Sequence, residues 1–141
     1  MGYEGADPNR FLTALTDAGV AAIADVRAVA LSRKRGFSKS ALRESLEARG
    51  LAYRHFIDLG TPKPGRDAAR AGDAATMRRI YCEEVLASPP AMAALDALAA
   101  FAEERPVCLL CFERDPANCH RRLLAERLAP RGFEAVDLFV P

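Results

Sequence analysis

Residues 107–121 read VCLLCFERDPANCHR and carry the clearest fold signal in the chain. Their first five residues, Val107–Cys111, form an unbroken apolar run, which is typical of a strand that a parallel sheet buries on both faces. A helix is predicted to begin at about Pro116 or Cys119 and to end at Ala129, because a proline follows directly. A buried strand followed closely by a helix indicates an α/β fold.

The rest of the chain continues this alternation. Strand patterns are predicted at residues 2–5, 20–26, 51–57 and 134–140, and helix patterns at residues 8–18, 38–49, 74–87 and 89–104. Residues 58–73 are rich in Gly and Pro and are predicted to form a long loop, which is usually mobile or functional. We therefore expect a single three-layer αβα domain over residues 1–141 with a mainly parallel sheet of about five strands. Its first strand is either very short or begins upstream of Met1.

The composition is that of an ordinary soluble domain. Of the 141 residues, 50% are hydrophobic, 28% are charged and four are cysteines. No apolar stretch approaches the roughly 18 residues that span a bilayer, and the N-terminus lacks the segments of a secretion signal. These features predict a cytoplasmic protein without membrane contact, in which the cysteines are reduced thiols. No cofactor is predicted.

Positive charge is concentrated in one region. The formal net charge is only +1, but residues 27–54 contain eight basic side chains and two acidic ones. A local positive field attracts phosphates or acidic partners even when the whole protein is nearly neutral. The plainer interpretation is a solvated helix face beside an exposed basic loop.

Polar side chains follow the ends of the predicted strands. Tyr3 lies near the end of the first strand, Asp25 and Arg27 lie at the end of the second, and Cys111 and Glu113 lie at the end of the strand that begins at residue 107. In an open parallel sheet, ligands bind outside the carboxyl ends of the strands. We therefore expect several of these side chains to meet at one rim, although any strand must end in polar residues.

The segment 110–121 has the residues for chemistry at that rim. Cys119 lies near a predicted helix N-terminus and beside arginines, an environment that favours a thiolate. His120 is a candidate general acid or base near neutral pH. Arg121 can grip a phosphate or carboxylate with two hydrogen bonds, and the helix start favours an anion.

Each of these residues also has a structural interpretation. Cys108 lies in mid-strand and Cys82 on a helix face, so both are assigned to packing, and Cys111 and Cys119 could likewise pack the helix onto the sheet. The pattern Cys108-x-x-Cys111 resembles half a zinc knuckle. Residues three apart on a strand point to opposite faces, however, so no metal site is predicted from this pair. A site formed by Cys111, Cys119 and a distant acid remains an alternative.

Several short motifs occur in order along nearly the whole chain. They are Gly2-Tyr3-Glu4-Gly5, Asp25-Val26-Arg27, Gly36-Phe37-Ser38-Lys39, Leu59-Gly60-Thr61-Pro62-Lys63, and Leu109-Leu110-Cys111-Phe112-Glu113 with Cys119-His120-Arg121. Together they resemble the family catalogued as domain of unknown function 488. The resemblance implies a compact α/β domain and supplies no established reaction. The family usually has several more residues in its first strand.

Two functional hypotheses follow. The preferred one is an enzyme that acts on a phosphate-bearing substrate, either a nucleotide or a nucleic acid. The candidate substrate-binding residues are Tyr3, Arg27, Arg33, Lys63 and Arg121. The candidate catalytic residues are Asp25, Cys111, Glu113, Cys119 and His120. The alternative is a non-catalytic module that binds nucleic acid or an acidic partner through residues 27–54, and a third interpretation makes the Cys-His-Arg segment a structural brace of the helix onto the sheet.

Overall fold

Three parallel strands form the sheet. In the computed structural model, which describes residues 1–141, β1 (Ala22–Asp25) lies between β2 (Ala52–His55) and β3 (Val107–Leu110). The register places Ala22 opposite both Ala52 and Val107, so the three carboxyl ends lie at one edge of the sheet. The α/β class and the parallel sheet are confirmed.

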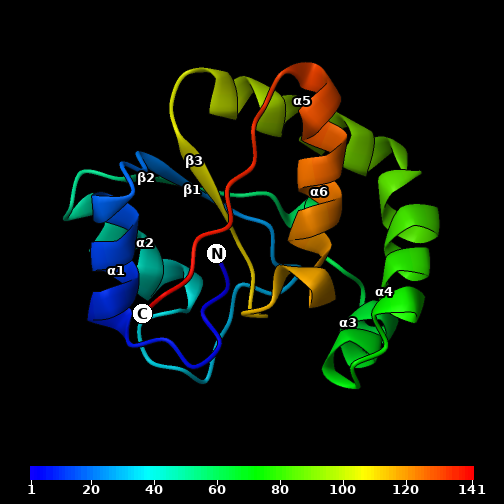
Figure 1. The fold of residues 1–141 in the computed structure, drawn as a ribbon, viewed down its shortest axis with the longest axis horizontal. Coiled ribbons are helices and arrows are strands. Elements are labelled where there is room, and N and C mark those ends of the chain that lie inside the picture. Colours follow the sequence, from blue (N-terminus) through cyan, green and yellow to red (C-terminus); the bar gives the residue numbers. More distant parts are fainter.

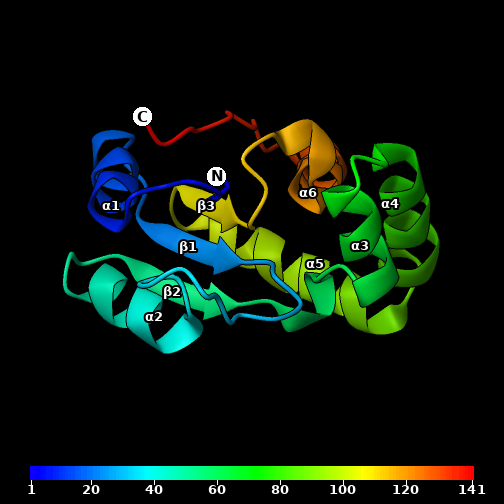
Figure 2. The same ribbon diagram turned by 90° about the horizontal axis from the view of Figure 1, so that it is seen from below.

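Helices cover both faces of this sheet (Figures 1 and 2). One face packs against α1 (Pro8–Asp17) and α2 (Lys39–Glu47), and Ile23 belongs to that core. The other face packs against α5 (Pro89–Glu103) and α6 (His120–Leu128), and Ala24 belongs to that core. Neighbouring residues of β1 therefore enter different cores, because successive side chains of a strand point to opposite faces.

Local sequence explains where the helices begin. The Asp7 carboxylate accepts hydrogen bonds from the backbone N–H groups of Asn9 and Arg10, and Pro8 occupies the first helical position of α1. Ser88 caps α5 in the same way by accepting from the N–H of Ala91. These helix starts agree with the sequence patterns.

The predicted loop at residues 58–73 is wrong for most of its length. A 3-10 turn (Ile57–Leu59) is followed by α3 (Lys63–Arg70), and α4 (Ala74–Ile80) continues into a π-helical turn (Tyr81–Leu86). Pro64 lies in the first turn of α3, where a proline removes no helical hydrogen bond. The prolines that predicted a loop are therefore compatible with a helix start.

The expectation of about five strands is also wrong. At the N-terminus only Gly2 pairs with Cys111 as an isolated bridge, in which the N–H of Tyr3 donates to the carbonyl of Cys111. Residues 134–140 form no strand, and no backbone hydrogen bond joins them to the sheet. Figure 1 shows this last segment passing the N-terminus on its way towards α1. Val140 packs in the α1–α2 core, but Val136 and Phe139 are exposed, so the apolar pattern of this segment reflects neither strand pairing nor continuous burial.

No single helix has the length and apolar character needed to cross a membrane, and only the pair Ala74–Leu86 and Pro89–Glu103, bent by 91°, meets those criteria jointly.

Candidate functional site

A pocket of about 600 Å³ lies at the carboxyl ends of the strands. The loop after β1, the region of α3, and the loop between β3 and α6 line most of it. This is the place where open parallel sheets bind ligands, and the volume suits a small molecule.

The pocket is strongly positive. Its charged lining consists of one carboxylate, that of Glu113, and five basic side chains, namely Arg27, Arg33, Lys34, Arg66 and Arg70. Arg33 and Arg70 are solvent-exposed, whereas Lys34 and Arg66 are half-buried. This concentration of charge exists although the chain has a net charge of only +1. Most of the charge that lines the pocket is therefore positive.

A buried ion pair holds Arg27 at the pocket wall. The Nε and one terminal nitrogen of Arg27 donate to the two oxygens of Asp25 at 2.8 and 2.7 Å, and Asp25 is fully buried. Another nitrogen of Arg27 donates to the Phe37 carbonyl at 2.6 Å. Burial acts to lower the pKa of Arg27, but the hydrogen bonds and charge of Asp25 outweigh it and raise the pKa. Asp25 does not line the pocket, so its observed contacts position Arg27.

Two tyrosines complete this cluster. The Tyr53 hydroxyl donates to Asp25 at 2.5 Å, and burial together with that carboxylate raises the pKa of Tyr53. The Tyr3 hydroxyl accepts from Arg27 at 3.3 Å. The ring of Tyr3 stacks on Phe37, with the centroids 4.6 Å apart, and meets the edge of Phe112. Tyr3 thus reaches the pocket from the N-terminal segment, as the strand-end argument expects.

Thr61 carries a buried hydroxyl with no hydrogen-bond partner. The residue is 3% exposed and lines the pocket immediately before α3. Arg66 donates to the backbone carbonyl of Thr61 at 2.9 Å and so fixes this corner. Buried polar groups are usually hydrogen-bonded, so the Thr61 hydroxyl is a candidate donor or acceptor for a molecule in the pocket.

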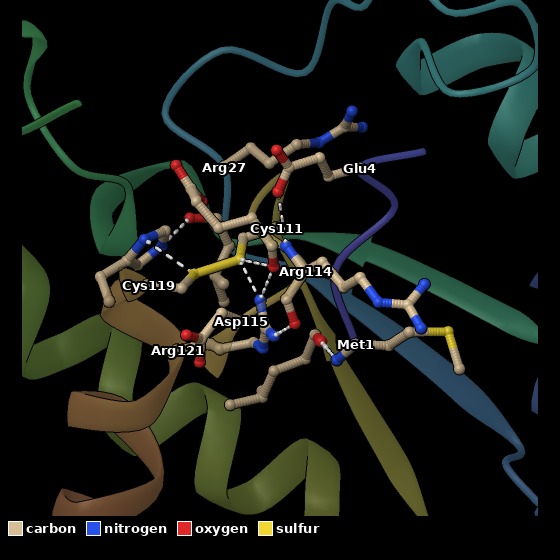
Figure 3. The surroundings of a disulfide bond; sticks show 12 residues. Met1, Glu4, Arg27, Cys111, Arg114, Asp115, Cys119 and Arg121 are labelled. Carbon is tan, nitrogen blue, oxygen red and sulfur yellow. Dashed lines mark hydrogen bonds between the residues drawn. A yellow bond between two sulfur atoms is a disulfide. The ribbon is translucent and has the colours of Figure 1, made fainter. Parts of the chain in front are cut away.

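The two cysteines of the pocket are joined to each other (Figure 3). Cys111, which directly follows β3, and Cys119, which caps α6, form a disulfide across eight residues of sequence. The expectation that all four thiols are reduced is therefore wrong for this pair, because the intervening loop folds back on itself. Cys82 and Cys108 are free, as expected.

Arg121 braces the loop that contains the disulfide. One terminal nitrogen lies 2.7 Å from Cys111 Sγ and also donates to the Glu113 carbonyl, and the other donates to the Arg114 carbonyl at 2.9 Å (Figure 3). The side chain is buried, and this burial lowers its pKa. Arg121 does not line the pocket. Its positive charge is instead directed at the sulfur of Cys111.

His120 is buried as a neutral imidazole. Its Nε2 lies 2.7 Å from the Val26 carbonyl, so that nitrogen carries the proton and donates it. Its Nδ1 lies 3.8 Å from Cys119 Sγ. Burial lowers the pKa of His120 to about 4. The ring therefore links the start of α6 to the end of β1, and its unprotonated nitrogen faces the disulfide.

Glu113 is the only acid of the pocket. Burial raises its pKa above the usual range for a carboxyl group, although the charge of Arg121 acts in the opposite direction. A carboxyl group with a raised pKa can give and take a proton closer to neutral pH than an exposed one.

One set of donors has the proximity that a metal ion requires. The ligand atoms of Cys111, Glu113 and Cys119 lie within 4.8 Å of one another. Two features oppose a divalent ion there: the sulfurs are bonded to each other, and the guanidinium of Arg121 places a positive charge against one of them. A metal could bind these residues only after the disulfide is reduced.

The pocket contains most of the residues that the sequence singled out. It is lined by Tyr3, Arg27, Arg33, Cys111, Glu113, Cys119 and His120. Asp25 and Arg121 lie directly behind it, whereas Lys63 points to solvent and pairs with Asp67 at 2.7 Å. Sequence reasoning missed Lys34, Thr61, Arg66 and Arg70. Thr61 belongs to a quoted motif, but nothing marked the two arginines, because they were placed in a loop rather than on a helix.

Fold and pocket together define a small α/β protein with a positively charged strand-end pocket. A family profile matches residues 7–128, and the chain belongs to the family described as Domain of unknown function DUF488. No curated protein and no solved structure matches the chain.

Proposed function

We propose that the protein is an enzyme that acts on a small phosphate-bearing substrate, with a nucleotide as the representative class. The charge of the pocket carries this proposal, because four basic side chains besides Arg27, which Asp25 neutralises, line a cavity of about 600 Å³ with one acid. Arginine is well suited to phosphate, since its planar fork donates two hydrogen bonds to one group. The position at the carboxyl ends of parallel strands supports the same conclusion.

The residues of the pocket divide into binding and reacting groups. Arg33, Arg66 and Arg70 would neutralise the phosphate, and the free hydroxyl of Thr61 would donate to one of its oxygens. The exposed ring of Phe112 offers an apolar surface at the same pocket for the rest of the substrate.

Glu113 is the group we assign to proton transfer. It lines the pocket, and its raised pKa favours a role as general acid or base. His120 is a weaker candidate for that role, because burial holds it neutral and its proton is donated to the Val26 carbonyl. Cys111 and Cys119 can act as nucleophiles only when their disulfide is reduced.

Calorimetric binding of adenosine monophosphate, with adenosine as the uncharged control, tests the binding step. We expect the nucleotide to bind and adenosine to bind much more weakly. Arg33→Gln and Arg70→Gln should each weaken nucleotide binding by roughly twofold to fivefold, which is the scale of a partly solvated ion pair. Arg43→Gln is the matched control, since it removes the same charge at a position outside the pocket. Equal binding by all variants would contradict the proposal.

A second set of variants separates an enzyme from a binding module. Arg43 and Arg49 lie in the basic region 27–54 but outside the pocket. If duplex DNA binds, weakens steeply with salt, and depends on Arg43 and Arg49 rather than on Arg33, the protein is a backbone-binding module. If Glu113→Gln abolishes turnover of a nucleotide while binding persists, the catalytic assignment stands.

A further inference from the structure

The disulfide belongs to the wall of the positive pocket. Cys111 and Cys119 both line the pocket, although the residues are only 1% and 2% exposed. The two free cysteines, Cys82 and Cys108, do not line it. A solute small enough to enter the pocket therefore meets the disulfide, whereas the surface of a folded protein cannot approach sulfurs that are buried to this degree.

We propose that Cys111 and Cys119 form a reversible dithiol–disulfide couple that exchanges electrons with a small anionic thiol bound in this pocket. The reactant must be small because the pocket holds about 600 Å³. It should be anionic because Arg33, Lys34, Arg66 and Arg70 face it with only Glu113 opposing. A carboxylate-bearing thiol satisfies both conditions.

The two sulfurs differ in their surroundings, which assigns their roles. Arg121 places a guanidinium nitrogen 2.7 Å from Cys111 Sγ. A Cys111 thiolate would form there with its positive partner already in place, so Cys111 is the better leaving group. Cys119 faces the neutral imidazole of His120 at 3.8 Å, which can accept a hydrogen bond from a thiol but offers no positive charge. Cys119 is therefore the sulfur that the incoming thiolate attacks.

The exchange balances in two steps. The thiolate of the reactant attacks Cys119 Sγ, a mixed disulfide forms, and the Cys111–Cys119 bond breaks with its electron pair leaving on Cys111. A second reactant thiolate then attacks the reactant's sulfur in the mixed disulfide, releasing the small disulfide and leaving Cys119, which takes a proton from solvent. Two reactant thiols are oxidised, the protein disulfide is reduced by two electrons, and the reverse sequence restores it.

This activity goes beyond the proposed phosphate chemistry, because it needs the charge of the pocket and not turnover of a phosphate ester. The test uses the intact oxidised protein and three thiols of different charge: 3-mercaptopropionate, 2-mercaptoethanol and cysteamine. Reduction is followed by alkylation and mass spectrometry, with Cys82 and Cys108 as internal free-thiol references. For each thiol, the rate of reduction of the protein is expressed per thiolate present. It is then divided by the rate at which the same thiolate reduces 2-hydroxyethyl disulfide, which is neutral.

On that scale, the anionic thiol should react on the order of tenfold faster than the neutral one at low salt, and the cationic thiol more slowly. The difference should shrink as salt rises and in the Arg33→Gln/Arg70→Gln variant, but not in Arg43→Gln, whose charge lies outside the pocket. Equal rates for the three thiols would refute selection by charge. If the small disulfide does not oxidise reduced Cys111 and Cys119 back to their disulfide, the reversible couple itself is refuted.

Rapid alkylation tests the assignment of the two sulfurs. The trapped intermediate should carry the small thiol on Cys119 and the alkyl group on Cys111, and the opposite pattern would overturn the assignment.

Arg121 is a positioning residue in this scheme. Arg121→Lys should still give the small thiol on Cys119 and the alkyl group on Cys111. Arg121→Gln should lose this preference and raise the pH at which Cys111 is alkylated. An unchanged pH profile of Cys111 alkylation would contradict the positioning role of Arg121. Nucleotide binding measured on the oxidised and reduced protein reports on the phosphate proposal separately, so either proposal can fail alone.

Discussion

At the scale of single residues, the pair Asp25 and Arg27 shows how the site is built from the core outward. Asp25 is fully buried, and Arg27 is 5% exposed. Asp25→Asn keeps the shape of the side chain but leaves a buried guanidinium without its counter-charge. We expect a loss of about 3–5 kcal/mol in the free energy of unfolding, measured by denaturant titration. Glu47→Gln, which breaks the exposed pair with Arg43, should change it by less than about 1 kcal/mol, and equal losses would contradict a buried pair.

His120 makes folding stability depend on pH. The pKa of this imidazole is about 4 in the folded protein instead of the ordinary 6.5, so between these values the unfolded chain binds a proton that the folded protein does not. Stability should therefore fall as the pH falls from about 6.5 to 4, by up to about 3 kcal/mol. Chemical denaturation at a series of pH values measures this loss. The stability profile of His120→Gln is subtracted from that of the wild type, which removes the contribution of the other titrating groups, including Glu113. If stability falls with pH equally steeply in that variant, His120 is not the cause of the loss.

At the scale of elements, the strand ends could be predicted from sequence but the surroundings of the pocket could not. The apolar runs before Asp25 and at Val107–Cys111 located two strands, because burial on both faces leaves a local pattern. α3 was missed because the prolines around it indicate both loops and helix starts. Residues 134–140 were taken for a strand because several of them are apolar, but only Val140 is buried, so apolar composition alone indicated neither burial nor pairing with a sheet edge.

The same limit explains the candidate site. Tyr3, Arg27 and Glu113 could be found because they are attached to strand ends, whereas Arg66 and Arg70 are brought to the pocket by α3. The bond between Cys111 and Cys119 depends on how the loop folds back, and no local pattern specifies that.

A close backbone approach between elements fixes one wall of the pocket. A Cβ added at Gly60 would overlap the backbone and Cβ of Ala28, which lines the pocket after β1. We expect Gly60→Ala to lower the free energy of unfolding by about 1–3 kcal/mol and to weaken nucleotide binding, because the wall must shift. Gly72→Ala is the control. It has open space but a φ of +76°, so it should lower stability by about 1–2 kcal/mol and leave binding intact. A Gly60→Ala protein with normal binding would show that the wall tolerates the shift.

At the scale of the whole molecule, three segments that are distant in sequence form most of the pocket: the loop after β1, the α3 region, and the loop from β3 to α6. A ligand that contacts all three stabilises the folded chain, since the unfolded chain cannot assemble the site. The midpoint of thermal unfolding should therefore rise with nucleotide concentration, by about 2.7 kcal/mol in stability at one hundred times the dissociation constant.

Thr61 should separate stability from binding in that experiment. Its hydroxyl is buried without a partner, so Thr61→Val removes a polar group that the ligand-free protein does not satisfy. We expect the ligand-free variant to be as stable as the wild type or more stable by up to about 1 kcal/mol, because the shape is kept and the desolvation cost is relieved. The stabilisation by nucleotide should shrink at the same time, because one donor to the phosphate is lost. Thermal unfolding of both proteins across a nucleotide titration measures the two effects together. A variant that is less stable alone, yet equally stabilised by nucleotide, would mean that the Thr61 hydroxyl serves the fold and not the ligand.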